Sequence, residues 1–224
     1  MLLNAPQREA IHYLDGPLLV LAGAGSGKTR VITQKIAYLI QECGFNPANI
    51  AAITFTNKAA REMQERITHM LGEKPKGITI STFHSLGVRL LREEATVLGY
   101  KPRFSIFDAT DCQAIVADLS GSVDKATIRR LQSIISNWKN GLVTPDAARH
   151  LASNETEALA ARVYLSYAAT LKAYQAVDFD DLIVLPVELF SQHPAVLDKW
   201  QNKLRYLLVD EYQDTNACQY TLLK

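Results

Sequence analysis

A glycine-rich run between an apolar segment and a helical pattern constrains this chain more than any other feature. The run Ala22-Gly-Ala-Gly-Ser-Gly-Lys-Thr29 fits the phosphate-binding loop (P-loop) pattern, with Ala in place of the first Gly. Its glycines let successive backbone N–H groups turn toward a phosphate, and the following helix adds the positive end of its dipole. The residues predicted to bind a nucleotide here are Ala22, Gly23, Ala24, Gly25, Ser26, Gly27, Lys28, Thr29 and Arg30.

Apolar runs that alternate with helical patterns extend this motif into a larger fold. The predicted buried strands are 17–22, 50–55, 77–82 and 206–210. The predicted helices on either side of the second strand are 28–42 and 57–71, with Asn57 as the cap of the latter and Gly72 as its end. Strands that alternate with helices indicate an α/β fold, in which a parallel sheet is covered by helices on both faces.

The pattern changes near residue 85 and stays mainly helical to about residue 176. Ile128–Ile135 and Ala158–Tyr174 are examples of this helical spacing. We interpret the segment as a helical insertion in the α/β domain. The predicted organisation is 1–84 for the first α/β segment, 85–176 for the insertion and 177–224 for the second α/β segment. The chain stops at Lys224 within an apolar stretch, so we expect it to be truncated.

Composition excludes several classes of protein. The formal net charge is +1, so any contact with nucleic acid must come from local basic patches. The three cysteines show no CxxC or Cys/His spacing, which argues against a disulfide framework and a structural zinc, and suits a reducing compartment. The N-terminus lacks a signal-peptide layout, and no apolar run approaches the roughly 18 residues of a spanning helix. We expect a cytoplasmic protein without a membrane segment.

A second motif supplies the acidic residues that a P-loop needs. The apolar strand that ends at Asp210 offers this carboxylate, with the Thr29 hydroxyl, as a ligand for Mg²⁺. Glu211 is placed to act as general base on the attacking water, and Lys28 to reach the β- and γ-phosphates. Asn57-Lys-Ala-Ala60 lacks the Asp of a guanine-reading motif, so ATP with Mg²⁺ is the expected cofactor pair.

Five motifs in a fixed order carry a family resemblance across nearly the whole chain. They are Leu3–Ile11, the P-loop, Ile53–Met63, Ile80–Ser85 and Asp210–Asn216. In this order they resemble the Q motif and motifs I, Ia, Ib and II of superfamily 1 helicases of the UvrD/Rep type. The segments Ile134–Lys139 and Trp200–Lys203 resemble the replication-restart branch of that family, and the repair branch of the UvrD/PcrA type is the alternative.

The resemblance implies a 3′-to-5′ translocase that hydrolyses ATP on single-stranded DNA, with a RecA-like 1A core interrupted by a helical 1B subdomain. It implies that Gln7 reads the adenine. The residues that it places on the DNA track are Phe55, Thr56, Asn57, Thr82, Phe83 and His84. For the two phenylalanines, core packing is the competing interpretation. For His84, the competing interpretation is a hydrogen-bonded structural role. Lys58 and Arg61 add positive charge that a solvated helix face explains equally well.

The family's motifs III to VI, with the arginines that reach the γ-phosphate, are not in these 224 residues. An arginine of this kind accelerates phosphoryl transfer by about 10³–10⁵. We therefore expect weak nucleotide binding, poor hydrolysis and no unwinding by this chain alone; the alternative function is a binding module without catalysis. The expected partners are single-stranded and 3′-tailed or forked duplex DNA and replisome proteins, for a monomer in the bacterial cytoplasm, at the nucleoid.

The acidic cluster Asp178, Asp180 and Asp181 permits two interpretations. A metal site is one, but no His or Cys joins the cluster. A helix cap is the preferred one, with Asp178 at the N-cap and Asp181 three residues later, where negative charge suits the first turn of a helix.

Overall fold

The structure is a computed structural model that describes residues 3–224, and they form two compact units. The first unit contains the chain up to residue 83 together with residues 195–213. The second unit contains residues 84–194 and 214–224. The division into 1–84, 85–176 and 177–224 made from the sequence pattern stays a prediction.

The first unit is built on a parallel sheet with the strand order β2-β1-β5. Its strands are β1 (Ile50–Thr54), β2 (Thr79–Thr82) and β5 (Tyr206–Val209). Its helices are α1 (Ala5–His12), α2 (Lys28–Gln41), α3 (Asn57–Leu71) and α10 (Pro194–Lys203), and short 3₁₀ turns cover Pro47–Asn49 and Tyr212–Asp214. Parallel strands flanked by helices confirm the predicted α/β class, and three of the four predicted strands are present.

Burial of one face of α2 and α3 on this sheet explains why the segment folds. All five residues of β1 are buried, as expected for a central parallel strand. Ile36 and Leu39 of α2 and Met63 and Ile67 of α3 are 0% exposed and belong to one apolar core. Each such side chain contributes about 1.5–3 kcal/mol relative to an exposed position. The helical spacing read from the sequence is therefore the spacing of the core contacts.

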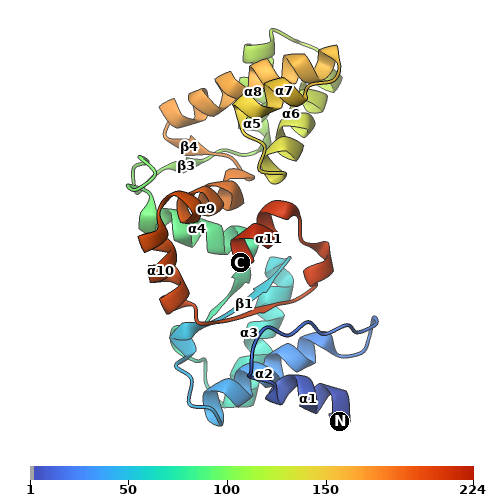
Figure 1. Ribbon diagram of the computed structural model, residues 1–224, viewed down its shortest axis with the longest axis vertical. Coiled ribbons are helices and arrows are strands. Elements are labelled where there is room, and N and C mark those ends of the chain that lie inside the picture. The colour runs from blue at the N-terminus through green and yellow to red at the C-terminus, as the bar shows by residue number, and fades with distance from the viewer. Residues whose placement is uncertain (1–2) are drawn as a thin grey trace. The chain divides into compact units, whose positions relative to one another are not determined.

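The prediction of a buried strand at 17–22 is wrong. This segment is an extended loop between α1 and α2, drawn in dark blue in Figure 1, and it forms no ladder with β1, β2 or β5. Leu19 is 62% exposed and Leu21 is 87% exposed. A strand requires neighbours for its backbone groups as well as apolar side chains. The apolar composition suggested a buried strand, but in the described residues no strand pairs with this run and its large side chains are exposed.

The cap of α3 also differs from the prediction by one residue. Thr56, not Asn57, is the N-cap, and its hydroxyl accepts a hydrogen bond from the N–H of Ala59 at 3.1 Å. Thr56 has the extended backbone of a cap, whereas Asn57 is already helical. Gly72 ends the helix with φ +79°, as predicted.

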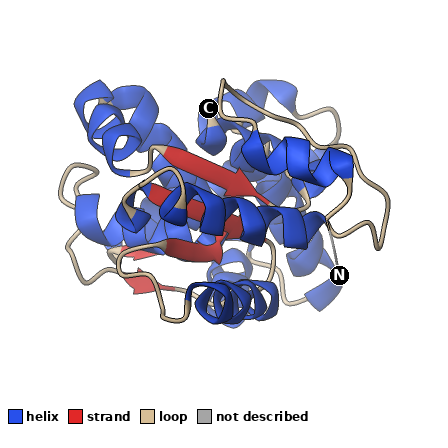
Figure 2. Cartoon of the chain, turned by 90° about the horizontal axis from the view of Figure 1, so that it is seen from below, coloured by secondary structure: helices blue, strands red, loops and turns tan. Residues whose placement is uncertain are grey.

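The second unit is mainly helical, and across the described residues helix predominates over strand (Figure 2). Its helices are α4 (Phe83–Glu94), α5 (Ala109–Ser120), α6 (Lys125–Asn140), α7 (Pro145–Leu151), α8 (Glu155–Ala173), α9 (Asp181–Gln192) and α11 (Ala217–Leu223). Helices α5 to α8 pack around a core that includes Leu131, Ile135, Tyr164 and Tyr167. Two short parallel strands, β3 (Ser105–Ile106) and β4 (Ala176–Val177), were not predicted, because two residues are too few to show a periodicity.

Helices α4 and α9 approach each other closely at Gly87. A Cβ atom added there would lie 1.7 Å from the carbonyl oxygen of Leu182. This neighbour is backbone and cannot rotate away, so only glycine fits. The sequence shows a glycine within a helical pattern at this point but not the helix that requires it.

Candidate nucleotide-binding site

The glycine-rich run forms an exposed loop that leads into α2. Gly25 and Gly27 have φ values of +72° and +86°, a conformation that favours glycine. The Ser26 hydroxyl donates to the carbonyl of Gly23 at 2.7 Å and closes the turn. Gly27 is the N-cap of α2 and provides no side-chain cap. The first N–H groups of α2 are therefore oriented as in an anion site at a helix N-terminus.

Thr29 and Asp210, which lie 181 residues apart in the chain, meet next to this loop. The Thr29 hydroxyl donates to Asp210 Oδ2 at 3.1 Å. Strand β5 places the carboxylate there, because the N–H of Asp210 donates to the carbonyl of Ile53 at 2.9 Å and continues the ladder with β1. A hydroxyl oxygen beside a carboxylate is the kind of ligand pair that Mg²⁺ prefers, so these residues fit that ion.

Lys28 and Glu211 form the other half of this arrangement. Lys28 Nζ lies 3.9 Å from Glu211 Oε2 and donates to the carbonyl of Ala22 at 3.4 Å. Glu211 has φ +52°, which is unusual for a residue with a side chain and typical of functional turns. Gln213 Nε2 donates to Glu211 Oε2 at 2.6 Å and so fixes the carboxylate. This role of Gln213 was not predicted, although the residue lies within the acidic motif itself.

Gln7 lies on α1 and reaches the same loop. Its Nε2 donates to the carbonyl of Ser26 at 2.9 Å, and its Oε1 accepts from the N–H of Asn4 at 3.0 Å. Arg30, the last residue predicted to bind the nucleotide, is half-buried in the first turn of α2. The structure therefore gathers Gln7, the glycine-rich loop, Lys28, Thr29, Asp210 and Glu211 around one place.

The residues predicted to line a DNA track divide into exposed and buried sets. Thr56 and Asn57 are exposed beyond the carboxyl end of β1, and Phe55 is half-buried. Thr82 and Phe83 are buried, with Phe83 only 1% exposed and its ring 5.5 Å from that of Phe55. Their side chains are little exposed, and side-chain contact with DNA at these two positions stays a prediction. Core packing, the competing interpretation, matches the burial of Phe83.

His84, in the second unit, stacks on a residue that the sequence analysis did not propose for DNA. Its ring lies 3.9 Å from that of Phe179 with an interplanar angle of 21°. Burial lowers the pKa of His84, an effect that the charge of Asp180 opposes. Phe179 is 59% exposed, which is unusual for a large apolar ring. In the sequence, the one available signal was an aromatic residue within an acidic cluster, to which no role was assigned.

The acidic cluster is organised by a lysine from α6. The prediction of Asp178 as the N-cap is wrong, because Asp180 is the N-cap of α9, whereas the predicted negative charge of Asp181 in the first turn is present. The two aspartates still bond reciprocally: the N–H of Asp178 donates to Asp181 Oδ2 at 3.2 Å, and the N–H of Asp181 donates to Asp178 Oδ1 at 2.9 Å. The helix itself begins at Asp181. Lys139 Nζ lies 2.7 Å from a carboxylate oxygen of each aspartate. Lys139 was not predicted to join this cluster, because nothing in the sequence links it to Asp178, 39 positions later.

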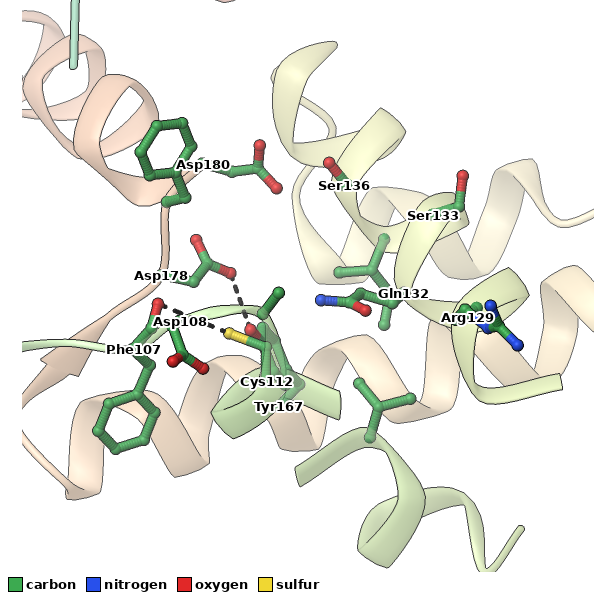
Figure 3. Close-up of a pocket in the computed structure, with 14 residues that line it drawn as sticks. Phe107, Asp108, Cys112, Arg129, Gln132, Ser133, Ser136, Tyr167, Asp178 and Asp180 are labelled. Carbon is green, nitrogen blue, oxygen red and sulfur yellow. Dashed lines mark hydrogen bonds between the residues drawn. The ribbon is translucent and has the colours of Figure 1, made fainter. Parts of the chain in front are cut away.

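Asp178 also lines a cavity of about 300 Å³ in the second unit. Figure 3 shows Tyr167 directed at Asp178, to which its hydroxyl donates at 2.9 Å, with Cys112 beside them. Arg129, Gln132, Ser133 and Ser136 of α6 line another wall. The cavity contains none of the residues predicted to bind the nucleotide.

The positive charge of Lys58 faces solvent on α3. Lys58, one source of the local positive charge, has a side chain 87% exposed and pairs with Glu62 at 4.0 Å, which is the geometry of a solvated helix face. In residues 3–224, no helix combines the length and the apolar character that crossing a membrane requires.

Comparison with known proteins gives consistent results. Residues 3–224 match the family described as the UvrD/REP helicase N-terminal domain. The chain is 53% identical to the ATP-dependent DNA helicase Rep of Escherichia coli K12, over 100% of this chain and 34% of the relative. It is 47% identical to the ATP-dependent DNA helicase PcrA of Staphylococcus epidermidis, over 99% of this chain and 31% of the relative. The chain thus spans about a third of the length of these relatives.

Proposed function

This chain belongs to the UvrD/REP helicase N-terminal domain family, and we propose that it carries the nucleotide-binding part of an ATP-dependent DNA helicase motor. One observation carries the proposal: the hydrogen bond between Thr29 and Asp210 joins the glycine-rich loop to the acidic strand end. Two motifs that must share one triphosphate are thereby adjacent. The names of the relatives, which are ATP-dependent DNA helicases, support the same function.

Each residue has a chemical role in this proposal. Backbone N–H groups of residues 23–28 bind the phosphates, and the Lys28 ammonium offsets their negative charge. Thr29 and Asp210 hold Mg²⁺, which when bound neutralises charge on the phosphates. Glu211, fixed by Gln213, accepts a proton from the attacking water. The Gln7 amide reads the adenine, because a paired donor and acceptor match adenine N7 and N6.

We extend the proposal to the rest of the motor. It is a 3′-to-5′ translocase on single-stranded DNA that acts in replication restart in the bacterial cytoplasm; a repair role of the UvrD/PcrA type is the alternative. This chain binds nucleotide weakly and turns it over poorly, since the arginines expected from motifs III to VI are not in it. ATP hydrolysis by this chain that single-stranded DNA stimulates strongly would contradict the expectation of poor turnover. It would also exclude the alternative of a binding module without catalysis.

Removing either Mg²⁺ ligand is expected to abolish the effect of Mg²⁺ on ATP affinity. In Thr29→Ala and in Asp210→Asn, the dissociation constant for ATP in Mg²⁺ should rise roughly tenfold, about 1.4 kcal/mol. Affinity without Mg²⁺ should change little. Because both residues serve one ion, the double variant should be no weaker than either single variant. The measurement is calorimetric titration with and without Mg²⁺.

Thr68→Ala is the matched control for this experiment, because that hydroxyl only donates to the Gln64 carbonyl on α3. It should retain the full effect of Mg²⁺. If Mg²⁺ still strengthened ATP binding in both Thr29→Ala and Asp210→Asn, the two motifs would not share an ion and the proposed function would lose its basis.

We also propose that single-stranded DNA contacts two groups of residues. In the first unit these are Phe55, Thr56 and Asn57, which follow the carboxyl end of β1, where ligands of parallel sheets bind. In the second unit they are His84 and Phe179, whose rings stack, and the exposed ring of Phe179 offers a face to a base. Hydroxyl and amide groups at Thr56 and Asn57 can hold phosphates.

Phe179→Ala is expected to weaken binding of an oligothymidine about 5- to 100-fold, because stacking of one base contributes roughly 1–3 kcal/mol. Fluorescence anisotropy measures this. Tyr174→Ala is the matched control, since Tyr174 is also in the second unit and 65% exposed. Equal losses in the two variants would indicate that exposed rings bind DNA nonspecifically, and no loss in Phe179→Ala would remove it from the DNA site.

A further inference from the structure

A buried lysine joins α2, the helix that follows the glycine-rich loop, to the end of α1. Lys35 is only 6% exposed. Its Nζ donates to the carbonyl of Ala10 at 2.8 Å and to that of Tyr13 at 2.5 Å. Both carbonyls belong to the C-terminal end of α1, where the last backbone acceptors lack helical partners and the helix dipole is negative. Lys35 therefore provides this end of α1 with both hydrogen-bond donors and a positive charge.

Burial of the Lys35 ammonium costs free energy, which its hydrogen bonds to α1 must offset. Burial lowers the pKa of its ammonium group, which the charge of Cys43 opposes. In residues 3–224 no carboxylate forms an ion pair with it. Its hydrogen bonds to Ala10 and Tyr13 both go to the C-terminal end of α1, and its ammonium lies 5.7 Å from the centre of the Tyr206 ring. The buried charge of Lys35 therefore holds α1 in place.

The other end of α1 carries Gln7, whose side chain is oriented by two contacts. Asn4 donates its N–H to Gln7 Oε1 at 3.0 Å, and Gln7 Nε2 donates to the Ser26 carbonyl at 2.9 Å. A flipped amide would set donor against donor at Asn4 and acceptor against acceptor at Ser26, so only this orientation is satisfied. An amide oxygen accepts two hydrogen bonds and an amide nitrogen donates two, so each atom keeps one further hydrogen bond for a ligand.

That remaining donor and acceptor pair discriminates between purines. Adenine presents an acceptor at N7 and a donor at N6, which an amide pairs in bidentate fashion, whereas guanine presents two acceptors, N7 and O6. The discrimination depends on where α1 lies. An eight-residue helix is marginal by itself, so its placement must come from packing. Ala10 and Ile11 pack on Val31 of α2, and Lys35 fixes the adjacent turn.

We propose that Lys35 is a positioning residue for adenine recognition, which holds α1 on α2 so that the Gln7 amide stays at the edge of the glycine-rich loop. This inference rests on the proposed function of that loop as an ATP site. Lys35 contacts no part of the nucleotide and acts through α1. Its loss therefore affects base selectivity and not phosphate binding.

Lys35→Met is expected to reduce the preference for ATP over GTP by about five- to tenfold, the effect of one or two hydrogen bonds. Affinity for inorganic tripolyphosphate with Mg²⁺ should stay within about twofold, because the phosphate donors are unchanged. Gln7→Ala should show the same loss, and the double variant no further loss. Lys35→Arg should retain the preference, since a guanidinium also donates to two carbonyls. Titration of the three ligands into the 224-residue chain measures all of this.

Several outcomes would overturn the inference. One is an unchanged ATP to GTP ratio in Lys35→Met, and another is an equal loss of ATP and tripolyphosphate affinity, which a general effect on the fold would produce. A wild-type chain that binds tripolyphosphate without preferring ATP would also contradict it. Failure of the wild-type chain to bind tripolyphosphate would instead contradict the proposed function. If circular dichroism shows that Lys35→Met is unfolded, Lys35→Gln, a neutral side chain that keeps an N–H donor, is judged by the same criteria.

Discussion

Replacing Lys139 by Met is expected to lower the free energy of unfolding of the second unit by about 3–5 kcal/mol, because two buried carboxylates lose their cation. The Lys139 side chain is 5% exposed, and those of Asp178 and Asp181 are 8% and 10% exposed. Burial alone would lower the pKa of Lys139, but the charges and hydrogen bonds of Asp181 and Asp178 together raise it above its usual value. Urea denaturation followed by circular dichroism measures the change.

The loss should shrink as the pH falls from about 8 to about 5, because protonation of a carboxyl removes the unpaired charge. Burial already raises the pKa of Asp181 to about 6. Such a carboxyl destabilises the folded state increasingly as the pH rises from its ordinary pKa to the raised pKa, and fully above the raised pKa. Without the ammonium, the pKa of this group rises further. The destabilisation is therefore largest at high pH and is relieved as the carboxyl gains its proton.

Two further variants show whether the ion pairs are responsible. Lys125→Met is the matched control, because Lys125 lies in the first turn of the same helix and is exposed. It should change stability by less than about 0.5 kcal/mol. The triple variant Lys139→Met, Asp178→Asn, Asp181→Asn should recover part of the loss, since no charge remains unpaired. If Lys139→Met and Lys125→Met unfolded at the same urea concentration, the network would not stabilise the fold.

This network shows why part of the fold could not be predicted from the sequence. Local patterns alone predicted the helical spacing of α6 and the acidic first turn of α9, although not that Asp180 is its N-cap. The partner of these aspartates lies on another helix, 39 residues from Asp178, and no local pattern encodes that pairing. The same is true of Gly87, because the requirement for glycine comes from the backbone of α9, which no local pattern encodes. Distant contacts of this kind depend on how helices pack and not on their own periodicity.

The strand predicted at 17–22 is wrong for a related reason. Its apolar composition is that of a buried strand, but a ladder also requires a neighbouring edge, and strand pairing is a property of the whole sheet. By contrast, the meeting of Thr29 with Asp210 was predictable over 181 residues, because the hydroxyl of a P-loop and the carboxylate at an acidic strand end serve the same Mg²⁺. Motifs that serve one ligand can therefore be assembled from the sequence, whereas a single contact such as that of Phe179 with His84 cannot.

The central claim is that residues 28–29 and 210–211 surround one triphosphate. Lys28→Ala tests it most directly. Lys28 is the residue that follows the glycines of the loop, and its ammonium lies 3.9 Å from the Glu211 carboxylate. Hydrogen bonds to charged groups contribute about 1.5–3 kcal/mol, so the dissociation constant for ATP with Mg²⁺ should rise about 10- to 100-fold.

Lys58→Ala removes an equal charge from an exposed position on α3 and serves as the control, which should bind ATP like the wild-type chain. Calorimetric titration of the three proteins with ATP and Mg²⁺ decides the matter. A large loss of affinity confined to Lys28→Ala is the result predicted here. Equal affinity of Lys28→Ala and the wild-type chain would place the nucleotide elsewhere and contradict the account.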